Sequence, residues 1–319
     1  MELSIGIDIG GTNSPFGVVS AEGEVLAKGS IKTRNYKDPE LFATDLAKEI
    51  KNALSAIKGD FTILGIGIGA PNGNHHQGTI EFAPNLPWKG VINLIALFQN
   101  HFKEPIFVTN DANAATIGEF IFGKAKGLKD FMVVTLGTGV GSGFVSNGEL
   151  VYGHDSFAGE LGHTIIVHDG RDCACGRKGC LETYASVTGL LRTAQIMLAK
   201  SSQKSMLRQI PTDQLSGKDI GDSAAKGDKL ALEILDYTAK RLAFSLANAV
   251  AITSPEAIFL FGGMARAGDL LLGPLKRYFE DYLLYLYRGK VRIEISALTE
   301  QNAAVLGASA LVWNEINKK

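Results

Sequence analysis

The sequence predicts an α/β protein made of a duplicated unit, with two lobes around a central cleft, and three observations lead to this prediction. The chain has 319 residues, enough for about two domains at roughly 100–200 residues each. Apolar strand-like runs alternate with helical patterns along the chain, as is typical of a mostly parallel sheet covered by helices. A glycine turn also recurs at constant spacing, since Gly11-Thr12, Gly17 and Ser20 reappear as Gly137-Thr138, Gly143 and Ser146. Glycine hairpins can look alike by chance, but the constant register favours duplication.

The elements of the first half follow from short β-branched runs that end in glycine, proline or asparagine. A helix is expected from Pro39, because Leu41, Phe42, Leu46, Ile50 and Leu54 have helical spacing and Asp38 precedes them as a possible N-cap. The expected strands are residues 3–9, 16–20, 24–28, 63–68 and 106–109, and the expected helices are residues 39–57 and 112–122.

The second half repeats the strand, turn, strand arrangement and then continues with alternating strands and helices. The expected strands are residues 131–136, 258–261 and 291–295, and the expected helices are residues 229–252, 270–287 and 303–316. We therefore expect a smaller lobe of residues 1–118 plus 300–319 and a larger lobe of residues 119–299.

Composition and charge exclude several classes of protein. Lys and Arg total 32 against 33 Asp and Glu, a net charge of −1, so no overall field attracts nucleic acid or an anionic membrane. The N-terminus has neither the basic nor the apolar region of a signal peptide. The long apolar stretch from Leu242 to Leu260 contains Asn248, Pro255 and Glu256, which argues against a membrane span. We expect a soluble cytoplasmic protein that binds neither nucleic acid nor membrane.

Three glycine turns at strand ends are candidate phosphate sites. In the run from Asp8 through Gly10, Gly11 and Thr12 to Asn13, backbone N–H groups can approach an anion closely, and Asp8 suits a hydrated Mg²⁺. A plain β-turn uses the same residue types, so each turn alone is a weak signal. The second and third turns contain Gly137, Thr138, Gly139 and Gly141, and Gly262 and Gly263, respectively.

All three cysteines of the chain lie in one short segment, Cys173, Cys175 and Cys180. Together with His163, ten residues upstream, they form a Cys₃His set, which suits tetrahedral zinc in a closed structural site. Three unrelated reduced thiols are the alternative. The other histidines lack such a setting and are expected to be loop or surface residues: His75, His76, His101, His154 and His168.

A candidate acid–base site lies at the junction of strand 106–109 and the following helix. Asp111 at the carboxyl end of this strand could accept a hydroxyl proton, although Asn110 or Asp111 could instead only cap the helix. Glu160 and Glu182 flank the cysteine segment, where their carboxylates could accept hydrogen bonds from a polyol. His163 could bind metal with one ring nitrogen and leave the other for a ligand.

These motifs resemble the ROK (repressor, open reading frame, kinase) family in kind and in order. They are Asp8 to Thr12, Asn110-Asp111, the Gly137 turn, the Gly159 to His163 segment and the Cys173 to Glu182 segment. The resemblance covers residues 5 to about 307 and implies the duplicated actin-like ATPase (ribonuclease H-like) fold. One departure is Ser14-Pro15, where many members carry a lysine or arginine after the first Gly-Gly-Thr.

Within the family the sequence is similar to bacterial kinases that phosphorylate glucose to glucose 6-phosphate. The resemblance implies that Asp111 is the catalytic base, with ATP and Mg²⁺ as cofactors, structural Zn²⁺ and a homodimer. It also implies two sets of binding residues. The hexose set is Asn85, Asn110, Asp111, Glu160, His163 and Glu182. The nucleotide set is the first two glycine turns for the phosphates, with Gly262 and Gly263 near adenosine.

Other functions within the family stay open. A kinase of N-acetylglucosamine or N-acetylmannosamine, or a fructokinase, is the nearest alternative, because the sequence does not show the room around the second carbon of the sugar. A sugar-responsive transcriptional repressor is a second alternative. It is less favoured, because the first expected strand begins at residue 3 and we expect no preceding winged-helix domain. A non-catalytic sugar sensor is disfavoured by the presence of Asp111.

Overall fold

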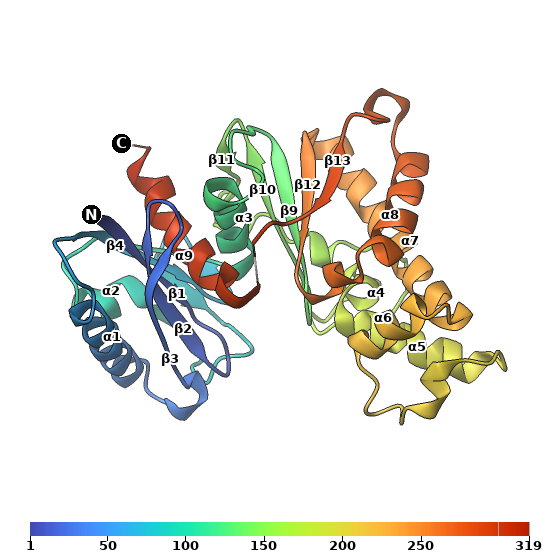
Figure 1. The fold of residues 1–319 in the computed structure, drawn as a ribbon, viewed down its shortest axis with the longest axis horizontal. Coiled ribbons are helices and arrows are strands. Elements are labelled where there is room, and N and C mark those ends of the chain that lie inside the picture. Colours follow the sequence, from blue (N-terminus) through green and yellow to red (C-terminus); the bar gives the residue numbers. More distant parts are fainter. Residues whose placement is uncertain (299, 319) are drawn as a thin grey trace. The chain divides into compact units, whose positions relative to one another are not determined.

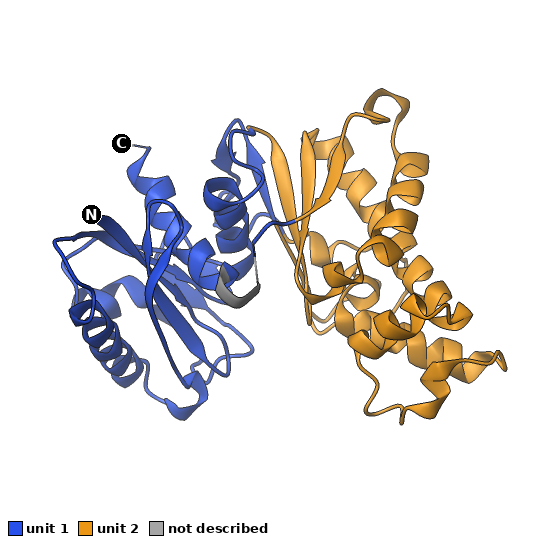
Figure 2. Cartoon of the chain, viewed as in Figure 1, with its two compact units in different colours: residues 1–128, 143–159, 296–319 blue, residues 129–142, 160–295 orange. Residues whose placement is uncertain are grey.

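The computed structural model describes residues 1–298 and 300–318, with only the backbone described for residues 300–302. The chain forms two compact units (Figure 2). Unit 1 comprises residues 1–128, 143–159 and 296–319, and unit 2 comprises residues 129–142 and 160–295. Lys319, at the end of the expected smaller lobe, lies outside the described residues. The compact units differ from the expected lobes mainly because residues 119–128 and 143–159 pack with unit 1, so the lobe boundaries stay a prediction.

Unit 1 is built on a five-stranded sheet with the order β3-β2-β1-β4-β8 (Figure 1). Strand β1 pairs antiparallel with β2 and parallel with β4, which in turn pairs parallel with β8. The first hairpin therefore makes the sheet mixed, and the expectation of a mostly parallel sheet was wrong on this point. The strands are β1 (Glu2–Asp8), β2 (Ser14–Ser20), β3 (Val25–Ile31), β4 (Thr62–Gly69) and β8 (Ile106–Thr109).

Helices cover this sheet and leave its carboxyl-terminal edge to loops. Helix α9 packs on β1, β4 and α3, and a Cβ at Gly67 would lie 1.8 Å from the Ala308 carbonyl oxygen, so glycine permits this close approach. Asp38 caps α1 as expected, accepting a hydrogen bond from Glu40 N at 2.9 Å. The helices are α1 (Pro39–Ser55), α2 (Leu94–Gln99), α3 (Asp111–Phe122), α9 (Glu300–Ile316) and a 3₁₀ turn at Thr33–Asn35. A small sheet, missed in the sequence, consists of β5 (Gly73–Asn74), β6 (Thr79–Glu81) and β7 (Val91–Asn93).

The second five-stranded sheet has the order β11-β10-β9-β12-β13, which matches the first sheet strand for strand. This correspondence confirms the internal duplication. Its strands are β9 (Phe131–Leu136), β10 (Val140–Ser146), β11 (Glu149–Leu150), β12 (Ala257–Phe261) and β13 (Arg292–Ile295). Strand β12 pairs parallel with β9 and β13, and β10 pairs antiparallel with β11.

Unit 2 carries most of the additional helices. They are α4 (Glu182–Ala185), α5 (Val187–Lys200), α6 (Gly217–Ala225), α7 (Lys229–Thr253), α8 (Asp269–Tyr282) and 3₁₀ turns at Leu161–His163, Met206–Gln209, Gly263–Ala267 and Tyr285–Tyr287. Helix α8 ends five residues before the expected Tyr287, because Leu283 adopts an extended conformation. The apolar pattern continued through Leu284 and Leu286, but both side chains are exposed.

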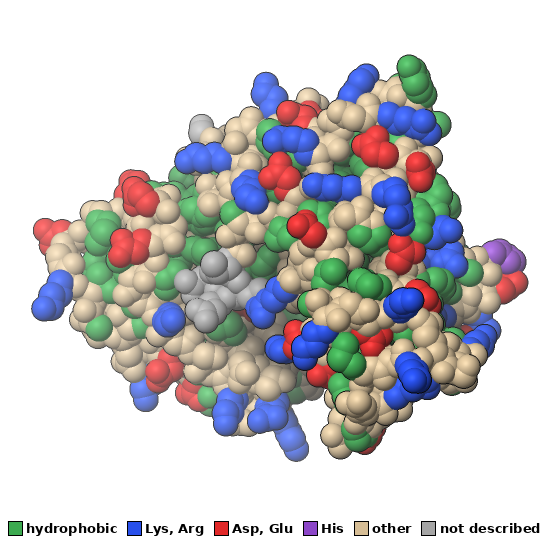
Figure 3. Space-filling model, turned by 45° about the vertical axis from the view of Figure 1, so that its right-hand side comes forward, with side chains coloured by type: hydrophobic (Ala, Val, Ile, Leu, Met, Phe, Trp, Pro, Cys, Tyr) green, Lys and Arg blue, Asp and Glu red, His purple; other side chains and the backbone are tan. Residues whose placement is uncertain are grey.

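Among the described residues, no helix combines the length and apolar character needed to cross a membrane. On the face drawn in Figure 3, basic and acidic side chains are interspersed, in keeping with the net charge of −1.

Candidate active site

Two carboxylates lie at the carboxyl ends of strands in unit 1. Asp8 ends β1, and Asp111 follows β8, on either side of β4 in the sheet order. Burial, and then the charge of Asp111, raise the pKa of Asp8 to about 6. Part of the Asp111 surface is exposed to solvent. The many protein atoms around Asp111 nevertheless desolvate its carboxylate, and this desolvation raises the pKa of Asp111. Both carboxylates therefore hold a proton more readily than ordinary aspartates do.

Hydrogen bonds to backbone N–H groups at the start of helix α3 hold the side chains of Asn110 and Asp111. Asn110 is the N-cap, and its Oδ1 accepts a hydrogen bond from Asn113 N at 2.7 Å. The capping interpretation is thus confirmed for the oxygen of Asn110, and its Nδ2 is left for a ligand. Asp111 Oδ1 accepts from Ala112 N at 2.9 Å.

The first glycine turn lies against Asn85. Gly10 N donates to Asn13 O at 3.2 Å and closes the turn. A Cβ at Gly11 would lie 2.3 Å from the Asn85 backbone oxygen, so the turn packs directly on this segment. In the described part of the chain, the backbone N–H groups of Gly11, Thr12 and Asn13 have no hydrogen-bond partner. Three such donors in succession are suited to an anion.

The second glycine turn is braced by side chains of unit 2. Gly141 N donates to Thr135 Oγ1 at 3.1 Å, and Val140 N donates to Glu182 Oε2 at 3.0 Å. Among the described residues, only Thr138 and Gly139 of the segment 137–141 have backbone N–H groups without a partner. Glu182, expected to bind a hexose, also supports this turn.

The four expected metal ligands come together. One ligand atom each of His163, Cys173, Cys175 and Cys180 lies within 4.8 Å of all the others. The Cys175 and Cys180 sulfurs are 3.6 Å apart, and His163 Nδ1 is 3.7 Å from Cys173 Sγ. A tetrahedral ion with metal–sulfur bonds of ~2.3 Å needs separations of roughly 3.5–3.8 Å, so the set fits zinc.

This geometry divides the two ring nitrogens of His163. Nδ1 faces the cysteines, whereas Nε2 lies 4.0 Å from Glu160 Oε2. Bound zinc would hold Nδ1 and leave Nε2 to a ligand beside Glu160. Arg177 supports the segment by donating to the His163 carbonyl oxygen at 2.9 Å.

A cavity of about 530 Å³ in unit 2 adjoins the third glycine turn. Gly263 and Met264 line one wall, and Lys218 and Asp222 of α6 also line the cavity. Gly262 does not line it; its φ of 104° and the nearby Leu136 backbone require glycine there. Sequence reasoning missed α6, although Ser216 and Asp219 form a capping box that signals its start.

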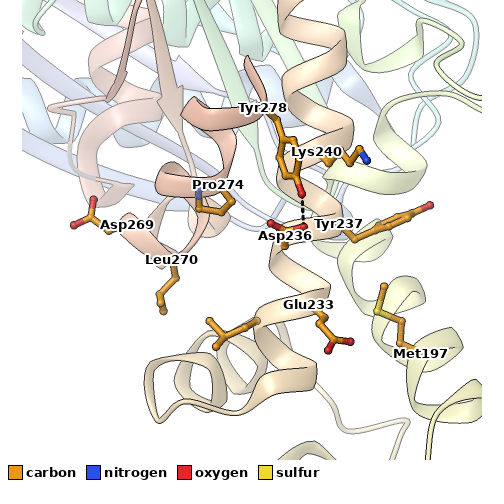
Figure 4. Close-up of a pocket in the computed structure, with 10 residues that line it drawn as sticks. Met197, Glu233, Asp236, Tyr237, Lys240, Asp269, Leu270, Pro274 and Tyr278 are labelled. Atoms are coloured by element: carbon orange, nitrogen blue, oxygen red, sulfur yellow. Dashed lines mark hydrogen bonds between the residues drawn. The ribbon is translucent and has the colours of Figure 1, made fainter. Parts of the chain in front are cut away.

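A second cavity, of about 630 Å³, lies among α5, α7 and α8 (Figure 4). Its central carboxylate, Asp236, accepts hydrogen bonds from Tyr278 Oη at 2.8 Å and Arg277 Nη2 at 2.9 Å. This carboxylate is therefore already paired with two side-chain donors.

Each unit thus brings together its own share of the expected residues. Unit 1 holds Asp8, the first turn, Asn85, Asn110 and Asp111, and unit 2 holds the second turn, Glu160, Glu182 and the metal set. The roles assigned to these residues stay predictions. Buried Asn113, whose side-chain atoms have no partner among the described residues, was not singled out, although it follows the Asn110-Asp111 pair.

Comparison with known proteins adds independent findings. Residues 4–315 match the model of the ROK family. The chain is 36% identical to a glucokinase of Halalkalibacterium halodurans over 98% of this chain and 96% of that one. It is 30% identical to a xylose repressor of Caldicellulosiruptor bescii over 98% of this chain but 78% of that one. A crystal structure of a ROK family glucokinase from Streptomyces griseus with glucose and AMPPNP superposes with a TM-score of 0.78 and 31% identity, covering 97% of this chain and 98% of that one.

Proposed function

Because the chain belongs to the ROK family, we propose that it transfers the γ-phosphate of ATP to the primary hydroxyl of glucose. The observation that carries the proposal is Asp111 at the start of α3, a carboxylate whose pKa is raised by desolvation. A base with a raised pKa removes a hydroxyl proton more effectively. The 36% identity to a glucokinase over nearly the whole chain supports glucose as the sugar.

Each residue has a proposed role in the reaction. Asp111 accepts the proton of the hydroxyl that attacks the γ-phosphate in line, and the unpartnered amides of the first turn bind phosphate oxygens. Asn110 Nδ2, Asn85, Glu160, His163 Nε2 and Glu182 are proposed hexose contacts. Adenosine is assigned to the cavity beside Gly263.

Two metal ions belong to this proposal. Asp8 offers carboxylate oxygen, the ligand type that Mg²⁺ prefers, and bound Mg²⁺ would offset charge on the phosphates. The Cys₃His set fits structural zinc, which would hold His163 beside Glu160. A cytoplasmic homodimer is the state we propose for the enzyme.

A coupled assay of ADP release tests the function. Glucose, mannose, fructose, N-acetylglucosamine and N-acetylmannosamine are compared by kcat/KM, and glucose should lead by at least about tenfold, or ~1.4 kcal/mol. If an N-acetylated sugar or fructose leads, the kinase remains and the assignment to glucose fails. If no sugar stimulates ADP release, a sugar-sensing role replaces the kinase.

A further inference from the structure

His75 contacts the free edge of the strand that leads to Asp111. Strand β8 is the last strand of its sheet, so its outer backbone groups have no neighbouring strand in that sheet. His75, between β5 and β6, places Nδ1 3.0 Å from the Val108 carbonyl oxygen. Because a carbonyl only accepts hydrogen bonds, Nδ1 carries the proton and donates it. The hydrogen bond closes the exposed edge three residues before Asp111.

The imidazole of His75 is itself held on several sides. Its ring stacks on Tyr152 with centroids 4.0 Å apart and an angle of 6° between the planes. Its backbone N donates to Ser156 Oγ at 2.8 Å, and buried Ser156 has a left-handed φ of 70°. Such strain in a non-glycine residue persists only where the surrounding structure fixes it. His75, expected to be an ordinary loop residue, is therefore in a loop but firmly packed.

Burial favours the neutral form of His75. Burial is the main cause that lowers its pKa, and the Glu315 carboxylate, 3.9 Å from Nε2, opposes this effect. Glu315 also pairs with Lys318 at 2.9 Å. A neutral imidazole with its single proton on Nδ1 is the form that the Val108 carbonyl requires.

The next residue of β8 is contacted from the same side. The hydroxyls of Thr109 and Tyr152 are both buried. Burial raises the pKa of Tyr152, and the neighbouring Thr109 hydroxyl partly opposes this effect. The stacked pair His75–Tyr152 therefore meets Val108 and Thr109, the last two residues before the Asn110-Asp111 pair.

We propose that His75 is a positioning residue for Asp111, because its hydrogen bond to Val108 fixes the end of β8 and with it the direction of the Asp111 carboxylate. The proposal rests on the proposed role of Asp111 as the base. Small displacements of a reacting group cost rate far more than they cost binding. Loss of the hydrogen bond should therefore lower kcat and leave both KM values nearly unchanged.

Three substitutions separate this hydrogen bond from general packing. His75→Phe keeps a ring to stack on Tyr152 and removes the donor, and we expect kcat to fall about tenfold with KM within about twofold. His75→Asn retains an N–H donor near the Nδ1 position and should recover much of the loss. His76→Phe is the matched control, since its ring lies 5.9 Å from Tyr152 and its Nε2 bonds Gly153 rather than β8. Its kcat should stay within about twofold of the unmodified protein.

Hydrogen exchange of the peptide covering residues 106–112 provides a readout that does not depend on activity. Exchange should accelerate in His75→Phe and stay unchanged in His76→Phe. If His75→Phe leaves both kcat and exchange unchanged, or if His76→Phe lowers kcat equally, the positioning role is wrong. If the unmodified protein phosphorylates no sugar, the proposed function fails. In that case unchanged exchange in His75→Phe overturns the anchoring of β8, and faster exchange supports it.

Discussion

The two glycine turns occupy equivalent places in the duplicated sheets, yet their surroundings differ. In the first turn, Gly11 packs against the Asn85 backbone, and three successive backbone N–H groups have no hydrogen-bond partner among the described residues. Asp8, whose pKa is raised, precedes this turn in the sequence. The second turn has two of its N–H groups bound by Thr135 and Glu182, and Glu182 also approaches the metal set through Cys173. The first turn thus has three successive N–H groups without partners among the described residues, whereas Thr135 and Glu182 hold the second turn.

This comparison shows that the two copies share a backbone arrangement but differ in the residues that contact the glycine turn. The strand order and the position of the turn are shared by the two copies. Asn85 and Glu182, the long-range neighbours of the first and second turn, are distant in sequence and differ between the copies. The predictions below change residues of each copy or the turns themselves.

The largest effect is expected for Asp111, the proposed base, which follows the last strand of the first sheet. Asp111→Asn should keep the shape of the site and remove the base, so kcat should fall about 10²-fold or more. Glucose-dependent ADP release measures the loss, and calorimetric titration with glucose should show retained binding. A folded variant within a few-fold of normal turnover would contradict the assigned role.

In the second copy the four expected zinc ligands, His163, Cys173, Cys175 and Cys180, lie close together. Cys173 is near Glu182, the side chain that holds the second turn. Freshly purified protein should contain about one zinc per chain, and Cys175→Ala should lose it along with sugar affinity, because the set positions His163 and Glu182. Metal analysis and Tm check both points. Lys178→Ala, in the same segment but outside the ligand set, should retain zinc. An active preparation without metal would rule out the structural role.

Matching substitutions test the turns directly. Gly11→Ala places a Cβ 2.3 Å from the Asn85 oxygen and should lower the free energy of unfolding by about 2–3 kcal/mol. Gly137→Ala meets no atom within 4 Å and should change it by less than about 0.5 kcal/mol. Urea unfolding measures both values.

Gly137→Val should in addition raise the KM for ATP about tenfold if phosphate approaches this turn. An unchanged KM would make the turn purely structural.

The smallest effect concerns Asp8 and depends on pH. Its folded pKa of about 6 exceeds the ordinary 3.8, so the folded protein binds the proton more tightly than the unfolded chain does. Stability therefore falls as the pH rises from about 4 to 6, and the penalty is complete above that range. Asp8→Asn should be more stable by about 1–2 kcal/mol at pH 7.5, below the ~3 kcal/mol upper bound of the shift. Urea unfolding at pH 7.5 and pH 4 should show the gain only at the higher pH.

Ionisation of Asp8 lowers stability at higher pH, but we expect catalysis to require the ionised carboxylate. If Asp8 acts as a carboxylate, activity should decline as the pH falls through about 6. A flat rate from pH 7.5 to 5.5 would show that its charge is not needed. Asp8→Asn should then also retain activity, which provides a second check.

Much of the fold could be predicted because the signals are local. Residues 106–109 and 131–136 were predicted as strands with the bounds that β8 and β9 have in the structure. Asp38 signalled the start of α1, and Cys173, Cys175, Cys180 and His163 indicated a metal set through residue type and spacing. Helix α6 was missed because it is short and polar overall, although its capping box and its buried residues Ile220, Ser223 and Ala224 have helical spacing.

By itself the sequence determined the strand positions of each copy, the recurring glycine turn and the ligand types, because these depend on neighbouring residues and on the period of apolar side chains. Tertiary structure alone decided that Asn85 packs on Gly11, that Glu182 braces Val140 and that His75 closes the edge of β8. Each of these contacts joins residues between 33 and 74 positions apart, and no local pattern encodes such a pairing. The raised pKa values of Asp8 and Asp111 arise in the same way, since desolvation exists only once the chain has folded around them.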